Sequence, residues 1–196
     1  MRSLPFLAAA LLAGAAFHPG AALAAPSQPG QISSVRPGEG APDRTAANMD
    51  RTDRKFAEAA AQAGLAEIAA GRLALQRSRD PRVREYAQQL VADHQAANAQ
   101  LQRIASAKGI VLPTSPSSGQ QRELRSLRRS GRSFDQDFLE QMARAHQKAI
   151  DLFGHEVKGR HQDAELKDFA QQTLVRLERH LGTAETLEKR SGHLPG

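Results

Sequence analysis

The sequence has no cysteine and no tryptophan, and aromatic residues make up only 4% of its 196 residues. Without cysteine the chain can form neither a disulfide framework nor a lipid-attached N-terminal cysteine. Its stability must therefore come from a well-filled aliphatic core or from a bound ligand. Buried side chains of the ligand type consequently become the features to look for.

Several catalytic signatures are also missing. The chain has no carboxylate cluster typical of hydrolases, no nucleophilic serine in a strained turn and no glycine-rich phosphate loop. These absences exclude classical hydrolase and nucleotide chemistry. The sequence favours a non-enzymatic role and leaves open a redox activity at a single metal ion.

Long apolar runs are scarce, and the longest lies at the beginning. Arg2 precedes the apolar run Leu4–Phe17, and Ala22–Ala24 forms a small-x-small cleavage motif. We predict that residues 1–24 are an export signal and that the protein is periplasmic, either free or associated with the envelope; a retained anchor is the alternative. Residues 25–51 are rich in Pro, Gly, Ser and Ala, which predicts a disordered linker.

The formal net charge is +6, and five arginines lie close together in one short segment. Their spacing favours one side of a short helix, which predicts a weak contact with an anionic membrane or a glycan. A solvated basic surface is the alternative interpretation. No aromatic residue is interleaved, so we expect no nucleic-acid partner. The five residues are Arg122, Arg125, Arg128, Arg129 and Arg132.

From Thr52 onward the apolar residues recur with a period near 3.6, which predicts an all-α domain over residues 52–190, followed by a flexible tail at 191–196. Asp80-Pro81 marks one helix start, and Ser133 with Gln136 predicts a capping box at another. Glycines are expected to end the second and third helices. The predicted helices span residues 52–78, 81–109, 134–159 and 163–190.

The connections between these helices predict the topology. The first and third connections are short, so each joins an antiparallel helix pair. Residues 110–133 are long enough to cross the bundle, and part of this segment is expected to form a short arginine-bearing helix. One long crossover between two hairpins is the ferritin-like four-helix arrangement. A short hairpin with an ordered insert is the alternative.

Each predicted long helix carries one metal-ligand side chain at the centre of its apolar stripe: Glu67, His94, His146 and His180. If the helices form one bundle, these residues meet inside it. Imidazole and carboxylate groups suit Fe, Mn, Zn or Cu, so we expect one transition-metal ion. The alternative is a metal-free network in which Glu67 pairs with the histidines or with Arg176.

Other titratable residues are expected at the surface. His155 is rotated about 180° from His146 on the same helix and should face solvent. Asp93 and Glu178 lie off the inward faces of their helices, so we predict that both are surface charges.

These segments resemble a family of exported bacterial proteins of unknown function that carry a ferritin-like domain and are often described as predicted outer membrane or putative membrane proteins. The resemblance covers residues 52 to about 187. The matching segments are Phe56–Gly71, Asp80–Val83, Tyr86-Ala87, Asp93-His94, Gly109–Pro113, Phe134-Asp135, Phe138, His146 and Leu174–Leu181.

The chain departs from this pattern in two respects. Val175 stands where the family commonly has proline. Di-iron proteins of the ferritin type also use Glu-x-x-His pairs, whereas the residues three positions before the histidines are Val91, Ala143 and Leu177. A bridged di-iron centre is therefore not expected. The resemblance implies no defined activity, because the family's biochemical role is not established and fold similarity alone does not transfer iron storage. For the Glu/His site itself we expect a storage, buffering or envelope-stress role.

Overall fold

The computed structural model describes residues 50–159 and 163–191. All of its regular structure is helical, so the all-α prediction is confirmed. The expected signal segment, the linker up to residue 49 and the tail beyond Ser191 lie outside the described residues. The helices are α1 (Arg51–Arg77), α2 (Pro81–Ala107), α3 (Ser118–Arg129), α4 (Phe134–Lys158) and α5 (Ala164–Ser191).

The helix ends follow local chemistry. Asp80 Oδ1 accepts from the backbone N–H of Arg82 at 2.8 Å, and Pro81 is the first residue of α2. Gly109, with φ of 67°, lies just beyond the end of α2 in the left-handed conformation that glycine adopts readily.

The predicted capping box at Ser133 is wrong. The Ser133 hydroxyl donates to the Asp137 carboxylate at 3.0 Å and makes no cap to the backbone. A charged acceptor makes the stronger hydrogen bond, which accounts for this choice. The capping box forms instead at the start of α3, between Ser117 and Gln120.

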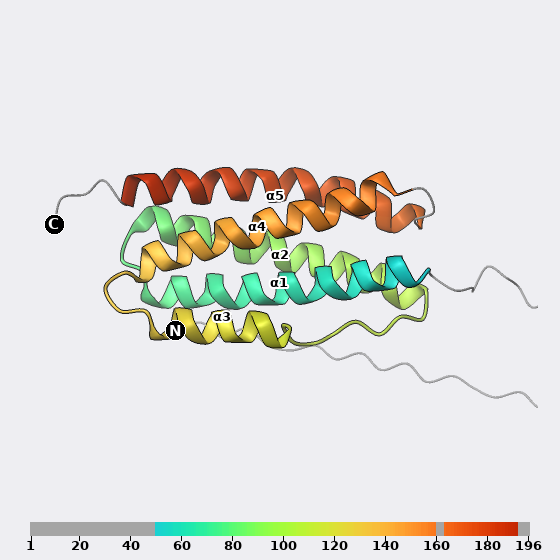
Figure 1. The fold of residues 1–196 in the computed structure, drawn as a ribbon, viewed down its shortest axis with the longest axis horizontal. Helices are drawn as coiled ribbons and strands as arrows, with labels where there is room; N and C mark the ends of the chain where they lie inside the picture. Colours follow the sequence, from blue (N-terminus) through green and yellow to red (C-terminus); the bar gives the residue numbers. More distant parts are fainter. Residues whose placement is uncertain (1–49, 160–162, 192–196) are drawn as a thin grey trace, which may run out of the picture. The chain divides into compact units, whose positions relative to one another are not determined.

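The helices pack into a bundle of five, where the sequence predicted four long helices and allowed a short one between them. α1 packs on α2, α4 packs on α5, and the two pairs meet through α1 with α4 and α2 with α5. Figure 1 shows α2 and α4 running in the same direction, while the connection that carries α3 returns along the bundle. Within the described residues, no helix is long and apolar enough to cross a membrane.

The short helix α3 is held against α1 and α4 from its C-terminal end. Leu124 and Leu127 are buried in the apolar core. The Arg77 guanidinium donates to the backbone carbonyl of Arg128 at 2.8 Å and lies 4.4 Å from the centre of the Phe134 ring. Arg77 thus satisfies carbonyl groups that the end of a helix leaves free.

A polar layer divides the core of the bundle. The residues Glu67, His94, His146 and His180 each separate two apolar clusters along their own helix. One cluster is built around Phe56, Leu101, Phe153, Leu166 and Phe169. The other is built around Val83, Leu90, Phe138, Leu139 and Leu187. Packing on both sides therefore fixes the four polar side chains at one level of the bundle.

Candidate metal centre

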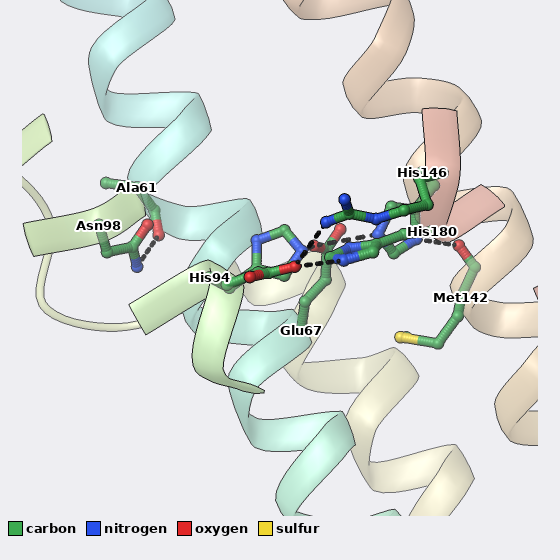
Figure 2. A network of polar contacts seen from close by, with 9 residues as sticks. Ala61, Glu67, His94, Asn98, Met142, His146 and His180 are labelled. Carbon is green, nitrogen blue, oxygen red and sulfur yellow. Dashed lines mark hydrogen bonds and ion pairs between the residues drawn. The ribbon is translucent and has the colours of Figure 1, made fainter. Parts of the chain in front are cut away.

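The structure brings together all four residues that the sequence singled out. Glu67 comes from α1, His94 from α2, His146 from α4 and His180 from α5. Their exposed fractions are 2%, 6%, 0% and 2% in that order, so the whole group is buried. Figure 2 shows the side chains turned toward one another from their separate helices.

The carboxylate lies against two of the imidazoles. Glu67 Oε2 is 2.5 Å from His94 Nε2 and 3.8 Å from His146 Nε2. The three imidazole rings have centroids 5.3–5.7 Å apart. One ring nitrogen from each histidine lies within 4.8 Å of the other two. Ligand atoms on three helices thus converge on a space of metal-ion dimensions.

Hydrogen bonds on the outer side of the group set which nitrogen faces the centre. His146 Nδ1 lies 2.8 Å from the Met142 carbonyl oxygen, and His180 Nε2 lies 2.9 Å from Asp93 Oδ2. Both acceptors require the histidine nitrogen to carry the proton. The lone pairs of His146 Nε2 and His180 Nδ1 are therefore free to bind a cation, an arrangement typical of metal-binding histidines.

The inward-facing atoms lack hydrogen-bond partners of good geometry in the described part of the chain. This holds for Glu67 Oε2, His94 Nε2, His146 Nε2 and His180 Nδ1. Buried polar atoms are normally paired, so this group could hold a common partner such as a metal ion. Arg176, the other partner considered for Glu67, forms no ion pair within the described residues.

Burial and mutual charge perturb every pKa in the group. Burial raises the pKa of Glu67, but the neighbouring His94 and His146 outweigh burial and bring it to about 2. Burial lowers the pKa of His94, but Glu67 overcomes this and raises it overall. Burial lowers the pKa of His146, and it brings that of His180 to about 4. The directions of these shifts favour, in the metal-free group, an ionised Glu67 beside a protonated His94, with His146 and His180 neutral.

The prediction that Asp93 is a surface charge is wrong. Asp93 accepts from His180 and also from the Arg179 guanidinium at 3.1 Å. It lies at the edge of α2 that faces α5, so its partner is on another helix and the periodicity of α2 alone does not reveal it. His155 and Glu178 are exposed, as predicted.

Tyr86 borders the group and was not identified from the sequence. Its ring lies edge-on to His180 with centroids 6.3 Å apart, and its buried hydroxyl has no partner among the described residues. Burial, and then the charge of Glu67, raise the pKa of the phenol. Tyr86 precedes His94 by two helical turns on the inward face of α2, and this spacing was the available signal.

A second pair of buried polar residues lies at the end of the core where α1 begins, and it was also not identified from the sequence. Asp53 and Glu156 are each 3% exposed, one turn beyond the contacting rings of Phe56 and Phe153. Asp53 accepts from the backbone N–H of Asp163 at 2.9 Å. Burial, and then the charges of Asp53 and Asp163, raise the pKa of Glu156 to about 7.

The fold and site define an all-helical domain with a buried group of three histidines next to a glutamate. Residues 39–187 match the model of a family described as a domain of unknown function, DUF4142. The chain belongs to this family. No curated protein matches it.

Among solved structures, the chain is similar to a crystal structure of a DUF305 fragment from Deinococcus radiodurans. The two share 19% sequence identity with a TM-score of 0.65, over 74% of this chain and 99% of the other. At this level of identity the likeness concerns the fold alone.

Proposed function

We propose that the domain binds one transition-metal ion through His94, His146, His180 and Glu67. The observation that carries the proposal is the convergence of four buried ligand side chains from four helices, in which His146 Nε2 and His180 Nδ1 have no hydrogen-bond partner among the described residues. A metal-free core would leave these two lone pairs unsatisfied, which is costly in a buried position. Hydrogen bonds from the far nitrogens of His146 and His180 support the proposal, since they aim the metal-binding lone pairs inward.

The donor set suits several metals. Three imidazoles and one carboxylate fit Zn, Cu, Fe or Mn. A four-coordinate ion would be saturated by these residues and would act structurally, whereas five- or six-coordinate Fe or Mn would keep a position open for oxygen chemistry. We favour storage, buffering or a role in envelope stress over fast turnover, because the sequence lacks the catalytic motifs of hydrolases and nucleotide-binding enzymes.

The wider setting belongs to the same proposal. We infer a ferritin-like arrangement, supported by the two helix hairpins and the long connection between α2 and α4. We also infer export to the periplasm, supported by the apolar run Leu4–Phe17 and the motif Ala22–Ala24. N-terminal sequencing of the exported protein would test the second inference, since cleavage is expected after Ala24.

Metal analysis tests the binding proposal directly. The protein is purified without an affinity tag that binds metals, reconstituted separately with Fe²⁺, Mn²⁺, Co²⁺, Zn²⁺ and Cu²⁺, and analysed by mass spectrometry. About one equivalent is expected in the unmodified protein and in His155→Ala, a control on the exposed face of α4, but not in His146→Ala. Less than about a tenth of an equivalent of every metal in the unmodified protein would overturn the proposal.

One observation favours a second candidate function, a contact with anionic surfaces. Four of the five clustered arginines lie on α3 or at its end, and all five are exposed. Neutralising Arg125, Arg128 and Arg129 should abolish salt-sensitive binding to vesicles that contain anionic lipid or to acidic glycans. Unchanged binding would show that these arginines form only a solvated surface. A domain that took up no metal but showed this binding would be the metal-free interaction module.

A further inference from the structure

A groove of about 630 Å³ runs between α1, α3 and α4 and ends at the candidate metal centre. Glu67 is one of its lining residues, although only 2% of its surface is exposed. The α1 side of the groove is a stripe of small residues, Ala59, Ala63 and Ala66, that leads along the helix to Glu67. The groove therefore reaches from solvent to Glu67, a residue of the centre.

Polar side chains of α3 and its N-cap line one side of the groove. Ser117, Gln120, Glu123 and Ser126 lie there together with the buried Leu127, whereas Leu124 packs in the apolar core. Small alanines opposite short polar side chains cannot fill the space between two helices. Water can occupy such a polar space, so an ion can remain hydrated along much of it.

The charge of the groove is opposite to that of the chain. Four carboxylates and two basic side chains line it, although the whole chain carries a net charge of +6. The two basic side chains are both paired, Arg144 with Glu140 at 3.4 Å and Lys148 with Glu123 at 3.8 Å. Asp137 is paired with no basic group and accepts only from the Ser133 hydroxyl among the described residues.

A second groove, of about 580 Å³, reaches the centre from the other side, between α2 and α5, and borders His180. Its charged lining consists of Arg82, Arg179 and Arg190 against Glu85, and two of these arginines are paired, Arg82 with Asp80 and Arg179 with Asp93. Carboxylates outnumber basic side chains on the α3 side, so a cation is attracted more strongly there. The two approaches to the same buried group thus differ in their balance of charge.

We infer that the groove between α1, α3 and α4 is the entry route for a divalent cation, with Glu123, Asp137 and Glu140 concentrating the ion and Glu67 receiving it. This inference rests on the proposed metal binding and adds the path and the residues that control its rate. The carboxylates of the groove act over distance on a hydrated ion, so they govern the rate of loading more than the final content.

Loading kinetics of the full chain test the route, with Co²⁺ alone as the probe and its visible absorbance as the signal. In the groove variant, Glu123→Gln, Asp137→Asn and Glu140→Gln are combined. The control makes the same change of charge on the exposed side of α5, with Asp168→Asn, Glu178→Gln and Glu185→Gln. Loading of the groove variant should be about tenfold slower than that of the control near 10 mM salt, and the difference should shrink below about threefold at 0.5 M.

A steric variant provides a second measure that does not depend on charge. Ala63→Leu fills the groove and should slow loading, whereas Ala92→Leu on the exposed face of α2 should not. Both leucine variants are expected to reach the Co²⁺ content of the unmodified protein. Equal loading rates in groove and control variants, with Co²⁺ bound in all, would overturn the route alone. Failure of the unmodified protein to take up Co²⁺ would overturn both the route and the metal site.

Discussion

Replacing Glu156 by glutamine should stabilise the protein at neutral and alkaline pH. Glu156 is 3% exposed, and Glu156 Oε1 has no hydrogen-bond partner among the described residues. Burial, followed by repulsion from Asp53 and Asp163, raises its pKa from 4.5 to about 7. The charged groups facing this end of the core are Asp53 on α1, Lys108 after α2, and Asp163 with Glu165 at the start of α5.

The sign follows from proton linkage. Because the folded pKa of Glu156 lies above the unfolded value, the folded state holds more protons between pH 4.5 and about 7. Stability from this group is fully present below pH 4.5 and is lost as the pH rises through about 7. A tenfold change in proton affinity corresponds to about 1.4 kcal/mol, so a pKa that moves from 4.5 to about 7 sets an upper limit of roughly 3.5 kcal/mol on the complete loss. Lys108 pairs with Asp163, which reduces the repulsion that the ionised Glu156 experiences.

Glutamine has the shape of the protonated glutamate, so Glu156→Gln should match the unmodified protein near pH 4.5 and exceed its free energy of unfolding by about 1–3 kcal/mol at pH 8. Urea unfolding at several pH values measures the difference. The exposed Glu178→Gln serves as the control and should show no such trend. Parallel stability profiles of Glu156→Gln and the unmodified protein from pH 4.5 to 8 would refute the reasoning.

Two further predictions concern the metal centre and the helix packing. Asp93→Ala should lower metal affinity by about 10- to 100-fold without changing the number of ions bound, because Asp93 orients His180. Competition with a chelator measures the affinity. An unchanged affinity would show that the contact between Asp93 and His180 does not support metal binding. Gly71→Ala should destabilise the protein by about 1–3 kcal/mol, because its Cβ would lie 2.8 Å from Val91 Cγ2 and 3.2 Å from the Ala87 carbonyl oxygen. Gly182→Ala, with no atom within 4 Å of the new Cβ, should stabilise the helix by about 0.5–1 kcal/mol. Thermal unfolding measures both glycine variants. Midpoint temperatures that move in the same direction for Gly71→Ala and Gly182→Ala would contradict the packing argument.

The sequence predicted the four polar residues because each signal lies within one helix. Glu67, His94, His146 and His180 each interrupt an apolar stripe, and the period of the helix alone places them inward. Helix ends were also accessible, since the cap at Asp80 and the left-handed Gly109 depend on neighbouring residues only. Local chemistry was sufficient for these features.

Features that depend on a second helix could not be predicted in this way. Asp93 acquires its role from His180 on α5, and the burial of Asp53 depends on α4 and on the backbone of Asp163. An acidic residue in the first turn of a helix is ordinarily a solvated group, so Asp53 gave no distinct signal. Two identical Ser-x-x-Gln patterns also competed as capping boxes, and the charge of Asp137 decided against the one at Ser133.

If the domain binds metal as proposed, the metal-free network and the metal-bound group are two states of the same residues. Without metal, Glu67 is ionised and sits 2.5 Å from His94 Nε2, whose pKa it raises, so a proton on His94 balances the carboxylate. A cation bound by this nitrogen must displace that proton, because the lone pair cannot serve both. Metal and proton therefore compete at His94, while His146 and His180 are already neutral and aimed inward. In the proposed site the ion pair would thus reduce the cost of burying Glu67 without metal, and the bound metal would be released more easily as the pH falls.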